Sequence, residues 1–202
     1  MNVMKKGRTL ALFDFDGTIT NRDTFIDFFK FVYGPWKIAG IAAKIAPFII
    51  LHFLKIYPGT KLKELFFGDL IKGWSRERFA QEAGNYYEKR LKKIIKTSAL
   101  NEIKKLKNEG AQIVVVTASA KEWVIPFTDD LGINIIATEL EVVDDLYTGN
   151  IKGKNCRGEE KVQRISDKYD TTLFDTVLAY GDSSGDKEML EFATKGFYRI
   201  FH

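Results

Sequence analysis

Two aspartates one residue apart could do chemistry in this chain. The stretch TLALFDFDGT (residues 9–18) puts Asp14 and Asp16 directly behind a short apolar run. Near the end of a strand, residues i and i+2 point to the same side, so both carboxylates could face one site, and Gly17 would let the chain turn sharply. Their repulsion is tolerable if a cation lies between them or if they differ in protonation. The pair indicates a metal site, an acid–base pair, or both.

A second acidic cluster, GDSSGD (residues 181–186), puts Asp182 and Asp186 behind another apolar run. Carboxylate oxygens suit Mg²⁺, which keeps several waters and often binds one or two carboxylates together with a phosphate. The chain has one cysteine, Cys156, and two histidines, so the ligands of a structural zinc site are missing. Magnesium is therefore the expected cofactor.

Two further positions could complete a phosphate site. Thr117 and Ala118 follow the apolar run IVVV, and the Thr117 hydroxyl and nearby backbone N–H groups could donate to phosphate oxygens. Lys161, in GEEK (158–161), could neutralise phosphate charge. Each has a structural alternative, since Thr117 also suits a helix N-cap and Lys161 could be one more solvated lysine, with Lys152 or Lys154 in its role.

These clusters need a scaffold that brings them together. The runs LALF (10–13), IVVV (113–116) and VLAY (177–180) suit fully buried strands. A helical pattern over 98–111 leads into the second run, and another, GEEKVQRISDKY from Gly158, lies between the second and the third. Strands alternating with helices predict a Rossmann-like parallel α/β sheet, in which ligands bind beyond the carboxyl ends of the strands. The polar clusters at Asp14, Thr117 and Asp182 all follow such ends.

One long segment breaks this alternation. Residues 22–96 have no strand-like run and are helix-like and aromatic throughout. We expect an α/β core formed by residues 1–21 and 97–202, with residues 22–96 inserted as a helical cap. Asp144-Asp145 and Gly149-Asn150 are turn residues between strand-like flanks, which predicts a β-hairpin within 139–154.

Composition narrows the class of protein. Hydrophobic residues make up 45% and charged residues 29%, which is typical of a globular chain, and a net charge of +4 is too small to indicate a nucleic-acid partner. A single cysteine fits a reducing compartment, and Asp14 interrupts the first apolar run too early for a signal peptide, so we expect a cytoplasmic location.

The tract 36–59 (WKIAGIAAKIAPFIILHFLKIYPG) is unusually apolar. Only ten residues lie between Lys44 and Lys55, too few to span a bilayer. We expect a buried cap helix, or a pair of helices broken near Pro47, in which His52 serves for packing. Peripheral membrane contact through residues 36–57 is the alternative.

The stretches DFDGT, VVVTAS, CRGEEK and GDSSGD, in this order, resemble the four motifs of the haloacid dehalogenase superfamily of phosphohydrolases. The insertion between the first two resembles the helical cap of the phosphoserine phosphatase-like branch. The resemblance implies that Asp14 is the nucleophile that forms an aspartyl-phosphate and that Asp16 is the general acid and then the base. It also implies that Thr117 binds the transferring phosphoryl group and that Lys161 stabilises its charge.

The resemblance further implies the metal ligands. Asp182 would bind Mg²⁺ together with Asp14 and the backbone carbonyl of Asp16, and Asp186 would support the metal site, through water or through Lys161. Asp16 and the acidic fourth motif favour a phosphatase over a dehalogenase. A mutase and a non-catalytic phosphate-binding module are further alternatives.

Selectivity would have to come from the cap. Where phosphoserine phosphatases have a glutamate nine residues after the nucleophile to bind the substrate amine, this chain has the shorter Asp23, so phosphoserine is not assigned. Arg76 or Arg78 could bind a substrate carboxylate. We expect a small soluble phosphate ester as substrate. A lipid phosphate is the alternative, because the superfamily's phosphatidylglycerophosphate phosphatases have a similar apolar stretch in their caps.

Overall fold

The computed structural model describes residues 8–202, and within them a six-stranded sheet forms the core. The strand order is β4-β3-β2-β1-β5-β6, and every pair is parallel except β3 with β4. The strands are β1 (Thr9–Phe13), β2 (Gln112–Ala120), β3 (Asn134–Val143), β4 (Leu146–Lys152), β5 (Thr176–Gly181) and β6 (Lys195–Tyr198). The three apolar runs form the adjacent strands β2, β1 and β5, which confirms the predicted parallel α/β core.

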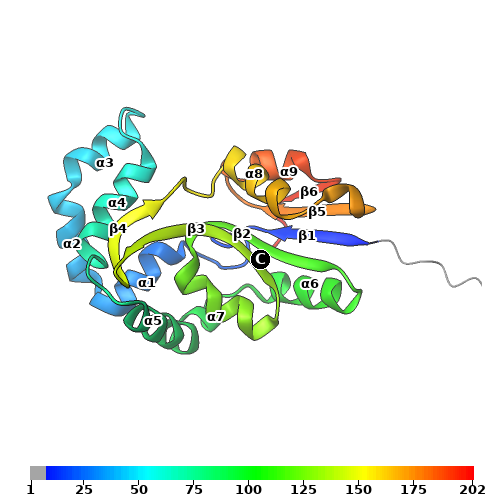
Figure 1. Cartoon of the computed structure of the whole chain (residues 1–202), viewed down its shortest axis with the longest axis horizontal. Coiled ribbons are helices and arrows are strands. Elements are labelled where there is room, and N and C mark those ends of the chain that lie inside the picture. Colours follow the sequence, from blue (N-terminus) through cyan, green and yellow to red (C-terminus); the bar gives the residue numbers. More distant parts are fainter. Residues whose placement is uncertain (1–7) are drawn as a thin grey trace, which may run out of the picture.

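Helices cover both faces of the sheet (Figure 1). Helices α6 (Thr97–Asn108) and α7 (Lys121–Leu131) lie on one face, and α8 (Glu159–Lys168) and α9 (Lys187–Phe192) lie on the other. Side chains alternate accordingly, since Leu10 and Leu12 pack in the cluster under α8 and α9, whereas Ala11 and Phe13 pack in the cluster on the opposite face. The short turns η1 (Leu91–Lys93) and η2 (Thr171–Leu173) are 3₁₀ helices.

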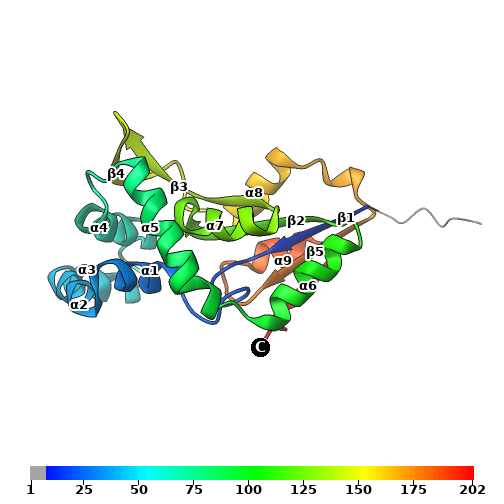
Figure 2. The same ribbon diagram turned by 90° about the horizontal axis from the view of Figure 1, so that it is seen from below.

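The inserted segment between β1 and β2 is helical, as expected, and gathers at one end of the sheet (Figure 2). It consists of α1 (Thr24–Tyr33), α2 (Pro35–Lys44), α3 (Ala46–Phe53), α4 (Gly59–Leu70), α5 (Arg76–Lys89) and η1. Aromatic packing joins it to the core, because the Trp123 ring of α7 stacks on Phe28 and Phe79. One buried apolar cluster therefore extends from the cap into the core.

The predicted hairpin is present and reaches the cap. Strands β3 and β4 pair antiparallel around Asp144 and Asp145, which both have positive φ. Strand β4 packs on α4 so closely that a Cβ at Gly149 would lie 2.8 Å from the Gly68 Cα. The Gly73 N–H also donates to the Tyr147 carbonyl at 2.8 Å. The hairpin belongs to the core in sequence, yet it contacts the cap along its length.

The apolar tract is a bent pair of helices, but its second half is not buried as we expected. Helices α2 and α3 meet at Ile45 with a 72° bend. Ile38, Ile41 and Ile45 are buried, whereas no residue of α3, all of which the structure describes, is fully buried. Within residues 8–202, no single helix has the length and apolar character needed to cross a membrane. The bent pair meets that criterion only when taken together, by length and composition.

Candidate active site

A cavity of about 1120 Å³ opens at the carboxyl ends of β1, β2 and β5, next to cap helices α3 and α4. It brings together positions that are far apart in the sequence. All the predicted site residues line it: Asp14, Asp16, Asp23, Thr117, Ala118, Lys161, Asp182 and Asp186. Their convergence follows from the parallel strand order, which places the ends of adjacent strands at one edge.

Lys161 links three elements at the bottom of this cavity. Its Nζ donates to Asp14 Oδ1 at 2.6 Å, to Asp186 Oδ1 at 2.6 Å and to the Val116 carbonyl at 2.7 Å. The side chain is buried, and each of its three N–H groups has an acceptor. It lies in the first turn of α8, which begins where the Gly158 N–H donates to the Gly185 carbonyl.

The electrostatics of this group are those of a buried ion network. Burial alone would lower the pKa of Lys161, but the Asp14 and Asp186 carboxylates outweigh it and raise that pKa above its usual value. Burial raises the pKa of Asp14 to about 7, although Lys161 opposes the shift. Burial acts in the same direction on Asp186, but there Lys161 and hydrogen bonds from Ser183 hold the pKa below its usual value. Lys161 therefore stays charged at neutral pH.

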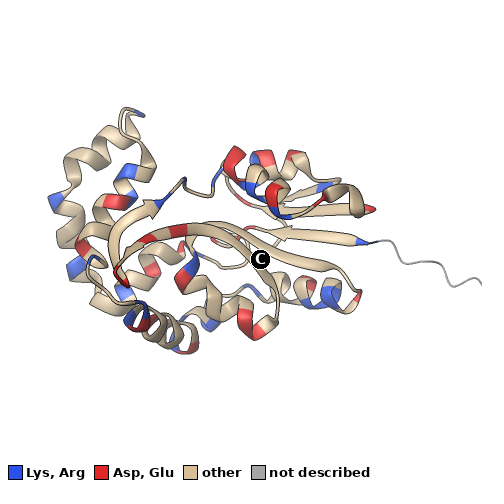
Figure 3. Ribbon diagram, viewed as in Figure 1, with Lys and Arg blue, Asp and Glu red and all other residues tan. Residues whose placement is uncertain are grey.

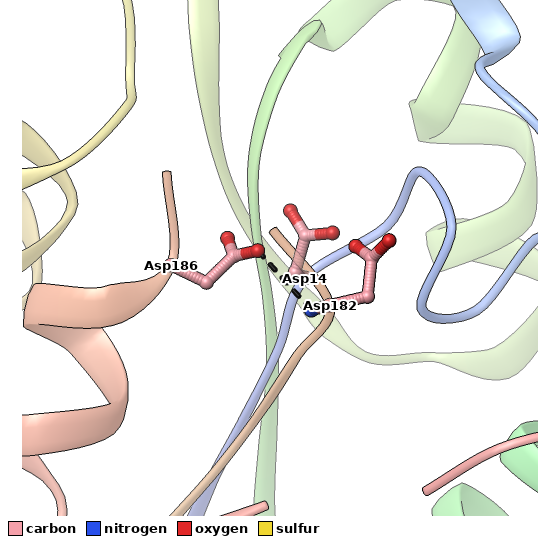
Figure 4. Close-up of side chains that lie close together, drawn as sticks. All are labelled: Asp14, Asp182 and Asp186. Atoms are coloured by element: carbon pink, nitrogen blue, oxygen red, sulfur yellow. Dashed lines mark hydrogen bonds between the residues drawn. The ribbon is translucent and has the colours of Figure 1, made fainter. Parts of the chain in front are cut away.

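Three carboxylates could hold a cation (Figure 4). One oxygen each from Asp14, Asp182 and Asp186 lies within 4.8 Å of the others. This all-oxygen donor set, with a single lysine among it, fits Mg²⁺. The Asp182 carboxylate approaches Gly17 so closely that a Cβ there would lie 2.3 Å from Oδ2, and φ at Gly17 is +78°. Glycine is therefore required behind Asp16.

The three carboxylates differ in the contacts that they already make. Asp186 Oδ1 accepts from Lys161, and its Oδ2 accepts from the N–H groups of Asp182 and Ser183 and from the Ser183 hydroxyl, at 2.7–3.2 Å. Asp182 accepts one longer bond, of 3.3 Å, from the Thr18 hydroxyl. Asp14 and Asp182 thus have more free acceptor capacity than Asp186.

Asp16 is held by a separate set of donors. Its Oδ1 accepts from the Thr24 N–H at 2.7 Å and the Thr24 hydroxyl at 2.6 Å, and its Oδ2 accepts from the Ser119 hydroxyl. The Trp123 indole N–H donates to the Thr24 hydroxyl at 3.0 Å and fixes it in turn. Burial, with a contribution from Asp23, raises the pKa of Asp16, and the bonds from Ser119 and Thr24 oppose that shift.

An irregularity in β2 shapes the wall of the cavity. Thr117 pairs with Ala137 and Ala120 pairs with Thr138, so Ala118 and Ser119 bulge out of the ladder. The Thr117 hydroxyl accepts from the Ser119 N–H at 3.0 Å, which makes it the cap of a local turn as well as a cavity residue. The Thr117 O–H hydrogen is not used in that bond.

Asp23 has a structural task that the sequence did not indicate. It is the N-cap of α1, and its carboxylate accepts from the Ile26 N–H at 3.2 Å. It also lines the cavity, so the capping bond does not exclude contact with a substrate amine. That contact stays a prediction.

Comparison with known proteins identifies the family of this chain. Residues 11–191 match the haloacid dehalogenase-like hydrolase family. The chain belongs to that family. This hydrolase is 35% identical to protein CicA of Caulobacter vibrioides over 95% of this chain and 86% of that protein. It is 29% identical to the phosphoserine phosphatase of Methanocaldococcus jannaschii over 93% of this chain and 83% of that protein.

Solved structures share the fold of the hydrolase. A Bordetella pertussis protein of unknown function superposes with a TM-score of 0.81 at 23% identity, over 93% of this chain and 88% of that one. A phosphoserine phosphatase solved as a phospho-aspartyl intermediate analogue superposes with a TM-score of 0.64 at 22% identity, over 96% of this chain and 86% of that one. The hydrolase is a phosphatase, similar to the phosphoserine phosphatases.

The cap side of the hydrolase's cavity contains a cation that sequence analysis missed. Lys63 of α4 donates to the Ala118 carbonyl at 3.1 Å, and burial lowers its pKa, although Asp16 and Asp23 oppose that shift. Nothing in the local sequence separates Lys63 from the other lysines of the cap. The arginines that we considered instead are elsewhere, because Arg76 pairs with Asp145 and Arg78 lies over the Trp74 ring.

Proposed function

We propose that the chain is a Mg²⁺-dependent phosphomonoester hydrolase that works through an aspartyl-phosphate on Asp14. One observation carries this proposal. The carboxylates of Asp14, Asp182 and Asp186 converge in a cavity that cap residues line, and the buried Lys161 bonds two of them, Asp14 and Asp186. A buried carboxylate held by a lysine, with free acceptor capacity toward the cavity, has what a phosphoryl acceptor needs.

The chemistry divides between the two aspartates of the first motif. A carboxylate oxygen of Asp14 attacks phosphorus, and the bond from phosphorus to the ester oxygen breaks as Asp16 gives that oxygen a proton. Asp16 then takes a proton from water, and the water oxygen attacks the phosphorus of the aspartyl-phosphate. The bond from phosphorus to the Asp14 oxygen breaks, which releases inorganic phosphate and restores the Asp14 carboxylate. The raised pKa of Asp16 supports its first role, because the group must carry a proton when the ester oxygen leaves.

The remaining residues bind and orient the phosphoryl group. Lys161 fixes the attacking carboxylate and offsets its charge, while Thr117 and the bulged backbone at Ala118 supply donors to phosphate oxygens. Bound Mg²⁺ would draw charge from the phosphoryl oxygens. We assign Asp14, Asp182 and the Asp16 carbonyl as its ligands. Asp186 acts in support, because both of its oxygens already accept bonds from protein donors.

Substrate choice belongs to the cap, which we take as residues 22–96. Asp23 and Lys63 place an anion and a cation beside the phosphate site, so a small zwitterionic phosphate ester would find a partner for each charge. A small soluble ester is therefore the first candidate, with the cytoplasm as the expected location. A lipid phosphate, with contact through residues 36–57, is the second, and the exposure of α3 favours it.

A phosphatase screen tests this proposal. The panel contains an aryl phosphate, phosphoserine, sugar phosphates and a phosphatidyl phosphate, each with Mg²⁺ and with excess chelator. We expect turnover with Mg²⁺ alone. We also expect none in Asp14→Asn, because an amide cannot accept the phosphoryl group. Turnover in chelator, or in Asp14→Asn after peptide mapping has excluded deamidation, would refute the mechanism.

A further inference from the structure

A compact group of large apolar side chains lies exposed where α3 ends and turns toward α4. We call it the apolar tip and define it as Ile50, Phe53, Leu54 and Ile56, which are 60%, 80%, 63% and 69% exposed. Single exposed apolar residues are ordinary on protein surfaces, whereas a contiguous group of this size marks an interaction site. Figure 1 shows the α3–α4 connection at the outer end of the cap, away from the sheet.

The backbone at the tip displays these side chains. Helix α3 ends with Lys55 in the left-handed region (φ 60°), and the Ile56 N–H donates back to the Leu51 carbonyl at 2.9 Å. Glycine is the usual residue at such a position, because a side chain there costs energy. The residue after it usually packs back onto the helix, but Ile56 points largely to solvent. This turn therefore does not bury its own apolar residue.

The chain segment around the tip has charge of one sign, although Asp69 and Glu64 of α4 pair with two of its lysines, Lys44 and Lys61. Residues 28–63 contain six lysines and no aspartate or glutamate. Figure 3 shows blue without red along α2, α3 and the turn that follows. Lys55 lies within the tip, and neither it nor Lys37 forms an ion pair with any residue in 8–202. Apolar side chains beside uncompensated lysines complement the surface of an anionic bilayer.

The tip is built on the wall of the catalytic cavity. His52, one residue before Phe53, lines the cavity, and its Nδ1 bonds the Tyr57 carbonyl at 2.9 Å across the turn. Gly59 and Thr60, which follow the turn, line it as well. A surface that binds the tip would lie next to the cavity.

We propose that the apolar tip docks onto membranes that contain anionic lipid and thereby holds the cavity at the lipid–water interface. Docking itself does not depend on the proposed function. Only its consequence, access to phosphomonoesters that carry a lipid anchor, rests on it.

Vesicle co-sedimentation of full-length Asp14→Asn protein tests docking without turnover. The vesicles contain phosphatidylcholine alone or with a quarter phosphatidylglycerol, at low and at high salt. We expect binding to the anionic vesicles that weakens with salt, and a loss of at least tenfold when Phe53→Glu and Ile56→Glu are added. Lys55→Glu should weaken binding too. No binding to anionic vesicles, or equal binding by the tip variant, would overturn the proposal.

Two matched controls separate the tip from general surface effects. Leu173→Glu adds one negative charge, as each tip substitution does, at a residue that is 56% exposed in η2, and Lys104→Glu reverses a charge on α6 as Lys55→Glu does at the tip. Both should bind vesicles as the parent does. With Asp14 intact, the tip variant should hydrolyse a soluble aryl phosphate at the wild-type rate, which shows that the fold and the chemistry survive, and should lose at least tenfold on a phosphatidyl phosphate in vesicles.

A second copy of the chain is the competing occupant. Sedimentation velocity over a range of concentrations measures self-association of the wild type. A monomer throughout supports docking onto lipid. A dimer that Phe53→Glu dissociates would make the tip an interface between chains and would refute the membrane proposal. If the aryl phosphate is not turned over while vesicles are still bound, the proposed function fails and docking stands.

Discussion

The ammonium group of Lys161 donates to oxygens from three elements: Asp14 after β1, Val116 in β2 and Asp186 before α9. Removing one partner of such a buried ionic group is costly, because the remaining charges lose their compensation without regaining water. The same side chain orients the carboxylate that we propose as nucleophile. Stability and turnover should therefore change together at this position.

Lys161→Met should lower kcat/KM for an aryl phosphate by about 10²-fold or more, since one preorganised electrostatic group is lost. In chelator it should also lower the free energy of unfolding by about 3–5 kcal/mol. Denaturant titrations with and without Mg²⁺ measure the second effect. Lys168→Met, at an exposed position of the same helix, is the control and should change neither. A loss in kcat/KM below threefold would show that Lys161 has only a structural role.

Asp16→Asn should slow the hydrolysis of esters with poor leaving groups far more than that of an aryl phosphate. An aryl oxygen can leave without being protonated, whereas an alkyl oxygen must receive a proton as it leaves. Steady-state rates on one aryl and one alkyl phosphate give the comparison. Ser119→Ala removes one donor from the same carboxylate and should have the smaller effect of the two. Equal slowing of both esters by Asp16→Asn would exclude Asp16 as the general acid.

Three of the residues that the sequence predicted for the cavity share one property. Asp14, Thr117 and Asp182 each follow an apolar run, so the topology of a parallel sheet is enough to bring them together. Lys63 has no such signal. It reaches the cavity because α4 packs on β4, and that contact depends on tertiary structure rather than on local pattern.

Among the secondary-structure elements, α7 has in its first turn a partly buried acid that the catalytic proposal does not use. Glu122 accepts a bond of 3.2 Å from the Tyr147 hydroxyl of β4, and its Oε2 has no partner among residues 8–202. Burial raises the pKa of Glu122 to about 7. The unfolded carboxyl ionises near its usual value of 4.5, so the folded protein loses stability relative to the unfolded chain as pH rises from there to about 7.

Glu122→Gln should remove that loss, because the amide keeps the acceptor for Tyr147 and does not ionise. We expect the melting temperature of the variant to match the wild type near pH 5 and to exceed it at pH 8. Thermal melts across this range test the sign. Glu109→Gln, at an exposed position after α6, should leave the pH profile unchanged. A wild type that gains stability over Glu122→Gln toward pH 8 would contradict the assignment.

Hydrophobic patterns located the elements but not their exposure. The alternation around Asp144-Asp145 was sufficient to predict the β3–β4 hairpin, because a turn between two strand-like runs is a local signal. For α3 the apolar pattern predicted a buried helix, which is wrong. An apolar run indicates that a helix has an apolar face but not what covers that face, and in this fold Phe53 stays exposed.

For the molecule as a whole, Mg²⁺ should act as a stabilising ligand, because folding assembles Asp14 and Asp182 from distant positions. At one hundred times its dissociation constant, a ligand specific for the folded state adds about 2.7 kcal/mol. For a chain of this size that corresponds to a rise of roughly 5–10 °C in melting temperature. Asp182→Asn should lose most of the rise, whereas Asp129→Asn, exposed on α7, should keep it. Equal shifts in both variants would argue against the site.

The position of β1 in the middle of the sheet has a consequence for how the protein is made. Leu12 pairs with Val114 on one side and with Ala179 on the other, so both neighbours of this strand are synthesised long after it. At about 5–20 residues per second, the apolar LALF segment stays without a partner strand for seconds on the ribosome. Pairings this distant in sequence also slow refolding. The strand that positions Asp14 is translated before either neighbour, and its pairing is completed only when β5 arrives.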